Sequence, residues 1–438
     1  MDEPKGKDAP PWYGGRLILP LVEYWKLRRS EESPSAVPGN TLSLSGPRAD
    51  EVQAFLEKLI RYPVEVSTFI KPDGAVERGE GWWGHLHGTM DMTAGIAEYG
   101  RLAHRPELVA WAKRVYEWIG RTNTTRYGWM ADVSGGTICE SCGIASRLRL
   151  GLALYRAGAV DPFGESDRFL RNQLLENQFV NLDFLTSLKP ETPRTEQKVF
   201  DGVDRMIRGT FQCWGTANDL MGNEDLEGCG AGGGVQALAL AWDAQAEWRP
   251  VPGNLGGQGS NLRARDKSLE PTSPAASEGE ELRIHLLFNR RLRARPEAPF
   301  ASTAPIAAEL WSYLPNEGRV TLLAHQNIDR VAMRLPDGAD PATAKVSRST
   351  LGPSFSSATA FDGPYVLIDH LAAGEQIDLR FTLQRYETTE RAAGVEYRVQ
   401  WKASAVTSLE PRGPRCPLYC DRTNLLNATA PLCAPRYP

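Results

Sequence analysis

The spacing of apolar residues changes once along this 438-residue chain, and that change limits the folds open to it. Before about residue 249, apolar side chains recur at the three- and four-residue intervals of amphipathic helices, as in residues 52–60. After about residue 280 they recur at every second residue, as in residues 377–383. The pattern therefore predicts a helical part followed by a β part.

Composition divides the chain further. Residues 249–280 are rich in Pro, Gly and Ser and show no periodicity, so they predict a linker. Helices joined without intervening strands favour a ring of helical hairpins, the α/α toroid, and the short alternating runs favour an antiparallel β-sandwich. The predicted segments are an N-terminal extension (1–48), the toroid domain (49–248), the linker (249–280), the sandwich domain (281–410) and an irregular tail (411–438).

Charge and hydropathy argue against several classes of protein. The 50 basic and 54 acidic residues give a net charge of −4, which argues against a nucleic-acid-binding protein with a strongly basic face. No run of about 18 uncharged apolar residues predicts a membrane-spanning helix, and the first residues lack the apolar core of a secretory signal. We therefore expect a cytoplasmic protein whose thiols are reduced and available for metal binding or chemistry.

The first chemical motif is Cys139-Glu140-Ser141-Cys142, at the start of a predicted helix. Thiolates and carboxylates are both zinc ligands. Glu140 and Cys142 are two residues apart, so they can converge only where the backbone is still entering the helix, and amides at a helix N-terminus also favour a thiolate. The alternative is that the two cysteines are simply buried in the core.

The second motif is the glycine-rich run 228–234, which contains Cys229 and opens another predicted helix. An accessible cysteine at a helix N-terminus suits a nucleophile or a metal ligand. A phosphate-binding loop is disfavoured because no Gly-Lys-Ser/Thr follows. The alternative is that the glycines only allow close packing where the helix begins.

The third motif is the aromatic and histidine-rich segment 82–88. Aromatic rings stack on the faces of sugars, and imidazoles hydrogen-bond to hydroxyl groups, so Trp83, His85 and His87 are candidate substrate-binding residues. A His-x-His pair can also bind a metal ion. The alternative is a turn before a helix with one buried histidine.

In this order, the motifs resemble those of glycoside hydrolase family 127, the β-L-arabinofuranosidase-like proteins. Residues 85–89 resemble the family's His-x-His helix, and residues 140–142 resemble its Glu-Thr-Cys motif. Residues 228–234 resemble its Gly-Cys-Cys-x-Gly-Asn-Gly helix start, and residues 312–318 with 411–419 resemble its C-terminal signature.

The resemblance implies a fold, a cofactor and a mechanism. The fold would be an α/α toroid followed by β-sandwich domains, and the cofactor a zinc ion bound by one glutamate and three cysteines. Carried onto this chain, Glu140, Cys142 and Cys229 would be zinc ligands. Cys229 would also be the nucleophile in a retaining hydrolysis of a glycan.

The chain departs from the family pattern in three ways. Gly230 stands where the family has the second cysteine of its pair, so one ligand is missing, and Cys139, Cys213 or water could replace it. Asp132 is the only carboxylate between residues 121 and 139, and it becomes the candidate acid/base where the family has a glutamate. The helical part is also short for a complete ring of hairpins.

These departures leave two alternatives to a zinc-dependent glycosidase. One is a non-catalytic, carbohydrate-binding or structural descendant of the fold. The other is a related toroid lyase or uronyl hydrolase that uses histidine rather than cysteine. The expected partner is a glycan or oligosaccharide, and neither nucleic acid nor a membrane.

Overall fold

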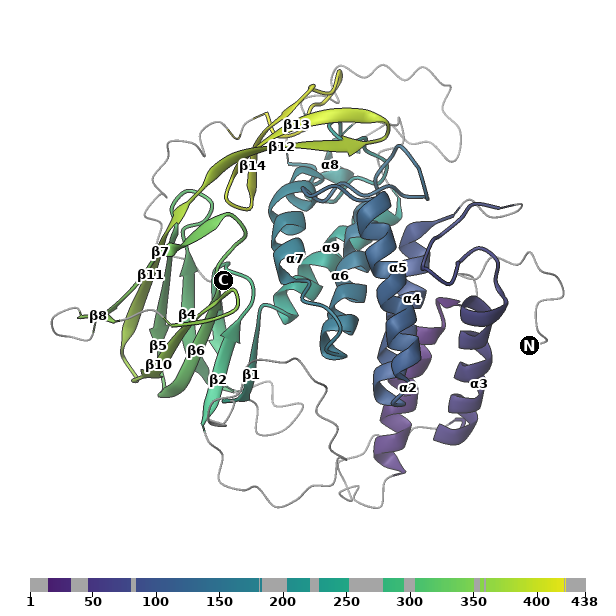
Figure 1. Ribbon diagram of the computed structural model, residues 1–438, viewed down its shortest axis with the longest axis horizontal. Coiled ribbons are helices and arrows are strands. Elements are labelled where there is room, and N and C mark those ends of the chain that lie inside the picture. Colours follow the sequence, from purple (N-terminus) through teal and green to yellow (C-terminus); the bar gives the residue numbers. More distant parts are fainter. Residues whose placement is uncertain are drawn as a thin grey trace. The chain divides into compact units, whose positions relative to one another are not determined.

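The computed structural model describes residues 15–32, 46–79, 84–180, 182, 203–220, 228–251, 279–294, 304–349, 355–357, 360–420 and 422. Most of the predicted linker, and parts of the predicted extension and tail, lie outside these residues. The chain divides into two compact units, drawn in Figure 1. Unit 1 comprises Met1–Leu240, Thr389–Tyr397 and Glu410–Leu418, and unit 2 comprises Ala241–Thr388, Arg398–Leu409 and Tyr419–Pro438.

Unit 1 is built from helices, as the apolar spacing predicts. They are α2 (Ile18–Glu31), α3 (Ala49–Arg61) with the π-helical turn η1 (Tyr62–Val66), α4 (Leu86–Leu102), α5 (Pro106–Thr122), α6 (Ser141–Arg156), α7 (Phe163–Phe169) with the turn η2 (Leu170–Leu174), α8 (Val203–Ile207) and most of α9 (Cys229–Asp243). Among the described helices, none combines the length and apolarity needed to cross a membrane.

Helices α4 and α6 lie at the centre of unit 1. Both are buried on nearly all sides, whereas α3 and α5 bury only one face. Helix α4 packs against α2, α5 and α6, and the ring of Trp25 on α2 lies 5.3 Å from that of Tyr99 on α4. A helix buried all round belongs to the core of its unit. The N-termini of α4 and α6 therefore start inside the protein, where the predicted site residues lie.

Part of the predicted irregular tail is fixed against unit 1. The carboxylate of Asp219 accepts hydrogen bonds from the backbone N–H groups of Arg415 (2.8 Å) and Cys416 (3.0 Å). Asn218 Nδ2 donates to the carbonyl of Pro411 at 2.7 Å. These bonds brace the chain just after Cys213, a residue weighed above as a zinc ligand.

Unit 2 contains two larger sheets. The five-stranded sheet has the order β1 (Ala246–Pro250), β2 (Glu280–Ile284), β6 (Ile328–Arg334), β10 (Tyr365–Leu371), β9 (Ala360–Asp362). The six-stranded sheet has the order β3 (Arg290–Arg293), β4 (Ile306–Ser312), β5 (Arg319–Ala324), β11 (Gln376–Leu383), β7 (Ala339–Ser349), β8 (Phe355–Ser357). A smaller sheet joins β12 (Arg385–Ala392), β13 (Val395–Lys402) and β14 (Ala405–Glu410), and its strands contribute to both units.

The apolar faces of the two larger sheets share one hydrophobic core. Ile284, Val331 and Met333 come from the first sheet, and Leu322 and Leu379 from the second. The two-residue period of β11 buries every second side chain, as the sequence predicts.

Two strand pairings add to the sequence-based expectation. Strands β1 and β2 pair antiparallel, with Arg249 opposite Glu281, so the Pro/Gly/Ser-rich stretch connects neighbouring strands of one sheet. Strands β2 and β6 pair in parallel, whereas only antiparallel pairs were expected. The connection from β2 to β6 passes through strands of the other sheet and is long enough for a parallel crossover.

A partly buried ion pair joins α6 to α7: the Arg147 side chain is 4% exposed and that of Glu165 is 22% exposed. Arg147 Nε lies 2.7 Å from Glu165 Oε1, and Tyr116 Oη donates to Glu165 Oε2 at 2.7 Å. Burial alone would raise the pKa of Glu165, but the Arg147 charge and these hydrogen bonds outweigh it and hold the pKa below its ordinary value of 4.5. The pair is therefore a satisfied buried network rather than a surface contact.

We expect Arg147→Leu to lower the free energy of unfolding by about 2–4 kcal/mol, because it leaves Glu165 largely buried without its charge partner. The matched control is Lys113→Ala, which breaks the exposed Lys113–Glu117 pair on α5 and should cost less than about 1 kcal/mol. Urea denaturation of both variants measures the difference. Equal losses would show that the buried pair contributes no more than a surface pair.

The same pair predicts a dependence on pH. A carboxyl with a lowered pKa stabilises the folded state above its ordinary pKa and loses that contribution as the pH falls through the lowered value. The difference in stability between the wild type and Arg147→Leu should therefore narrow as the pH falls below 4.5, the ordinary value for Glu165. Denaturation at pH 7 and at pH 4 tests this; a difference that grows in acid would contradict the assignment.

Candidate functional site

The N-terminus of α6 brings Glu140 and Cys142 together. Glu140 is the N-cap residue and has an extended backbone (φ −115°, ψ 133°), while Cys142 lies in the first helical turn. This change of backbone direction lets two residues that could not share a helix face converge, with Cys142 Sγ 3.3 Å from Glu140 Oε2.

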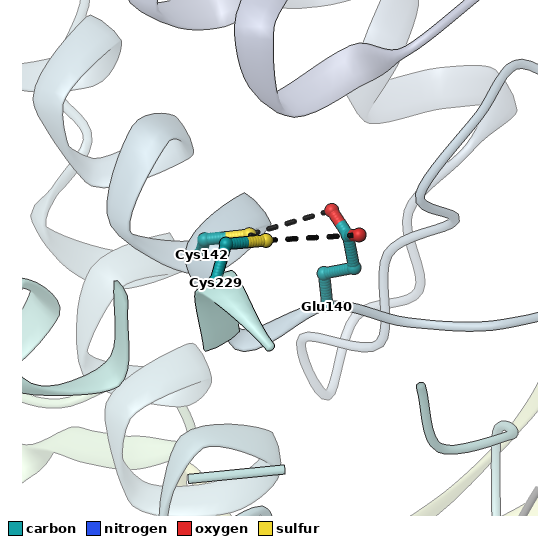
Figure 2. A group of neighbouring side chains, drawn as sticks. All are labelled: Glu140, Cys142 and Cys229. Atoms are coloured by element: carbon teal, nitrogen blue, oxygen red, sulfur yellow. Dashed lines mark hydrogen bonds between the residues drawn. The ribbon is translucent and has the colours of Figure 1, made fainter. Parts of the chain in front are cut away.

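Helix α9 begins at Cys229 and adds the third donor. Cys229 Sγ lies 3.3 Å from Cys142 Sγ, although the two residues are 87 positions apart, and 3.9 Å from Glu140 Oε1. Figure 2 shows both sulfurs pointing toward the carboxylate, each facing a different oxygen. Among the described residues these three offer ligand atoms that all lie within 4.8 Å of one another. The group can hold a metal ion, and the whole of it belongs to unit 1.

The glycine run explains how α9 comes so close. A Cβ on Gly233 would lie 2.3 Å from Cys142 Cα, one on Gly230 would lie 2.4 Å from the carbonyl oxygen of Gln212, and one on Gly234 would lie 2.1 Å from the Phe211 ring. Any larger residue at these positions would push the first turn of α9 away. Close packing and the metal-ligand hypothesis are therefore not rivals, because the packing brings Cys229 to Cys142.

Neighbouring side chains orient the carboxylate. His85 Nε2 lies 3.2 Å from Glu140 Oε2, and Trp214 Nε1 donates to Glu140 Oε1 at 3.2 Å. Residues that hold a metal-binding carboxylate in this way fix its direction and tune its basicity.

The thiols are electrostatically coupled. Hydrogen bonds from Cys142 and Cys213 lower the pKa of Cys229 to about 2, against the opposing effect of burial, and the nearby His87 and His85 lower it further. The same hydrogen bonds, with burial, raise the pKa values of Cys142 and Cys213 far above the usual range of a thiol. Cys229 is exposed while Cys142 and Cys213 are buried, so the thiol with the lowered pKa is the accessible one.

The donor set fits zinc. Thiolate and carboxylate ligands at about 2.3 and 2.0 Å from a tetrahedral zinc are separated by roughly 3.8 Å (sulfur to sulfur) and roughly 3.5 Å (sulfur to oxygen). The observed distances are 3.3 Å between the two sulfurs, and 3.3 and 3.9 Å from sulfur to oxygen, which is close to these ligand–ligand distances. The two thiolates and the carboxylate would repel one another when ionised, and a bound divalent cation would stabilise them at these short distances.

The predicted histidines lie beside this group. The rings of His85 and His87 meet edge to face, 5.4 Å apart. His87 Nδ1 is 2.6 Å from Ser146 Oγ and 3.6 Å from Asp91 Oδ2. Burial lowers the pKa of His87 despite the raising effect of Asp91. Trp83, the third predicted substrate-binding residue, lies outside the described residues.

Asp132 lies outside the three-donor group but near it. Its carbonyl accepts a hydrogen bond at 2.9 Å from the N–H of Leu86, the first residue of α4. Its Oδ1 is buried and has no hydrogen-bond partner among the described residues. Burial, followed by the negative charge of Glu140, raises the pKa of Asp132 above its ordinary value of 3.8. A carboxyl with a raised pKa gives up its proton at a pH closer to neutrality, which suits acid/base work.

Two residues were missed or undervalued in the sequence. Cys213, weighed only as one possible replacement ligand, has its Sγ 3.8 Å from Cys229 Sγ. Trp214, the next residue, carried no signal of its own, although its indole binds Glu140. Their proximity comes from the chain that crosses the start of α9, where Ser141 Oγ donates to the Gln212 carbonyl at 2.8 Å.

Comparisons with known proteins locate this fold. No family model matches the chain, and no curated protein does. Solved structures do. One described as a glycoside hydrolase has 11% identity, a TM-score of 0.53 and an alignment over 89% of this chain and 59% of its own. A GH127 β-L-arabinofuranosidase from Geobacillus stearothermophilus T6 has 10% identity and a TM-score of 0.46, and the alignment covers 83% of this chain and 53% of its own. A GH127 β-arabinofuranosidase has 12% identity and a TM-score of 0.49, and the alignment covers 88% of this chain and 59% of its own.

The first of these structures shows that the chain shares a fold with a glycoside hydrolase. The chain spans between 53% and 59% of the length of the three neighbours.

The glycine run makes a paired prediction about stability. Gly230→Ala should destabilise the fold by about 1–3 kcal/mol, since the added methyl group meets backbone that cannot move aside alone. The control is Gly232→Ala in the same helix turn, where a Cβ meets nothing within 4 Å. There alanine should stabilise the helix by about 0.5–1 kcal/mol. Thermal unfolding measures both, and the packing argument fails if the two variants behave alike.

Proposed function

We propose that this chain is a glycoside hydrolase of the β-L-arabinofuranosidase type, acting by a retaining mechanism with Cys229 as nucleophile. The finer fold description, an α/α toroid over residues 49–248 and a β-sandwich over residues 281–410, belongs to the same proposal. The observation that carries it is the meeting of Glu140, Cys142 and Cys229 within 4.8 Å, from two helix N-termini far apart in sequence.

The metal part of the proposal concerns zinc. Glu140, Cys142 and Cys229 would hold the ion, and bound zinc would keep their sulfurs deprotonated and fixed in place. The hydrogen bond from Trp214, and the close approach of His85, keep the Glu140 carboxylate turned toward the sulfurs.

The chemical steps follow from the positions of Cys229 and Asp132. The Cys229 sulfur attacks the anomeric carbon, so a carbon–sulfur bond forms as the glycosidic carbon–oxygen bond breaks. Asp132 gives its proton to the departing oxygen. Water, losing a proton to Asp132, then displaces the sulfur, and two inversions restore the original configuration. His85 and His87 would hydrogen-bond to sugar hydroxyls, and Trp83 would supply a stacking face.

Cys229→Ala tests the nucleophile. We expect hydrolysis of a nitrophenyl β-L-arabinofuranoside to fall by more than about 10³-fold, because Cys142 and Cys213, the thiols beside Cys229, are buried and cannot replace its sulfur. The matched control is Cys139→Ala, which removes a buried thiol whose pKa is raised to about 12 by burial. It should keep nearly full activity.

Three results would overturn the proposal in different directions. Turnover that survives Cys229→Ala but is lost in His87→Ala would favour a toroid lyase or uronyl hydrolase. Glycan binding without hydrolysis by the wild type would favour a non-catalytic descendant of the fold. A chain that takes up no zinc would remove the metal part.

Asp132→Asn tests the acid/base. Loss of a proton donor should reduce kcat by about 10²–10⁴-fold for substrates whose leaving group must be protonated. A nitrophenyl substrate leaves without a proton, so its first step should be affected much less. The ratio of the two rates is the measurement, and equal effects on both substrates would rule out Asp132 as the proton donor.

A further inference from the structure

Cys213 occupies a notch beside Cys229. Its side chain is fully buried, and its Sγ lies 3.8 Å from Cys229 Sγ. A Cβ on Gly228 would lie 2.8 Å from Cys213 Sγ, so the glycine before Cys229 leaves the space that this sulfur fills. The backbone N–H of Gly230, on the other side of Cys229, donates to Cys213 Sγ at 3.4 Å. Backbone hydrogen bonds of this kind stabilise and orient ligating sulfurs.

Position 230 itself cannot carry a side chain in this fold. A Cβ there would lie 2.4 Å from the carbonyl oxygen of Gln212 and 2.9 Å from Cys213 Cα. A cysteine at 230 and the chain at 212–213 therefore exclude each other. The chain that prevents a thiol at position 230 brings a different thiol, that of Cys213, to the same place.

We propose that Cys213 is the fourth donor of the metal centre, so that zinc is bound by Glu140, Cys142, Cys213 and Cys229. The inference rests on the metal site of the proposed function and not on hydrolysis. The separation of 3.8 Å between Cys213 and Cys229 matches the sulfur–sulfur edge of roughly 3.8 Å in a tetrahedral zinc site. Cys213 is not within 4.8 Å of every other donor, so the proposal requires a change in its side-chain rotamer when the ion binds.

The other candidate, Cys139, points elsewhere. Along an extended backbone, successive side chains alternate in direction, so Cys139 and Glu140 face opposite sides. The Cys139 sulfur contacts the Asn177 side chain and the backbone of Met130 instead. Water is the remaining alternative for the fourth position, and the experiment below separates it from Cys213.

This assignment also gives the three sulfurs different roles. Cys142 and Cys213 are buried, while Cys229 is exposed. Two buried thiolates and Glu140 would hold the ion from the protein side, and Cys229 would be the one thiolate that a bound molecule can reach.

The test is X-ray absorption spectroscopy at the zinc edge of the wild-type, zinc-loaded protein. We expect a first shell of three sulfurs and one oxygen. Two sulfurs with two oxygen or nitrogen atoms would overturn the assignment of Cys213 while leaving the metal site of the proposed function intact. Failure to bind any zinc would overturn both, so the two failures are distinguishable.

Cobalt substitution checks which residue supplies the third sulfur. In Cys213→Ser, the thiolate-to-cobalt charge-transfer band should lose about one third of its intensity, and the apparent zinc affinity should fall at least about 10-fold. The matched control Cys139→Ala should keep the wild-type spectrum. Circular dichroism verifies that both variants fold. An unchanged band in Cys213→Ser, or a loss in Cys139→Ala, would contradict the proposal.

Discussion

Backbone contact between the first turns of α6 and α9 is the constraint on which the candidate site depends. Gly233 lies so close to Cys142 that a Cβ would stand 2.3 Å from its Cα. No side chain can be placed between the helices there, so the residues at their starts, Cys142 and Cys229, must meet. The apolar side chains of α9 contribute less to this contact, since Val235 and Leu238 are exposed and the buried face is made of small residues such as Ala237. Docking by glycine and alanine permits short distances, and short distances are what metal ligands require.

The same geometry sets the electrostatics. Both cysteines start helices, where unpaired backbone N–H groups favour negative charge, and the thiols of Cys142 and Cys213 hydrogen-bond to Cys229. The pKa of the exposed sulfur is therefore lowered, while the pKa values of the two buried thiols beside it are raised. Asp132 is affected in the opposite way, because burial and the charge of Glu140 favour its protonated form. The two pKa shifts therefore have opposite signs, as the proposed nucleophile and proton donor of a two-step hydrolysis would require.

Much of this arrangement could be predicted from local sequence. The change of apolar period separated helices from strands because burial of one face imposes the period of each element. Glu140, Cys142 and Cys229 stood out because their residue types and their places at helix starts carry chemistry. The contribution of Trp214 and the position of Cys213 could not be predicted, because both depend on how residues 211–215 cross the start of α9. The parallel pairing of β2 with β6 was missed for a similar reason, since alternation along a strand does not specify its neighbour.

The proposed placement of the fourth ligand at position 213, rather than at position 230, would have a consequence for the chemistry. With two adjacent cysteines at its start, a helix would supply both the attacking sulfur and one of the sulfurs that hold the ion. In the proposed metal site α9 would supply only Cys229, and the other three donors would be Glu140, Cys142 and Cys213. Glu140 accepts a hydrogen bond from Trp214, the residue after Cys213, so these two donors are linked through residues 213–214. Cys213 also accepts a hydrogen bond from the backbone N–H of Gly230, so the same segment is held against the start of α9. Separation of the reacting sulfur from the supporting ligands requires that Gly228 and Gly230 remain glycines, because both leave space for the chain that carries Cys213.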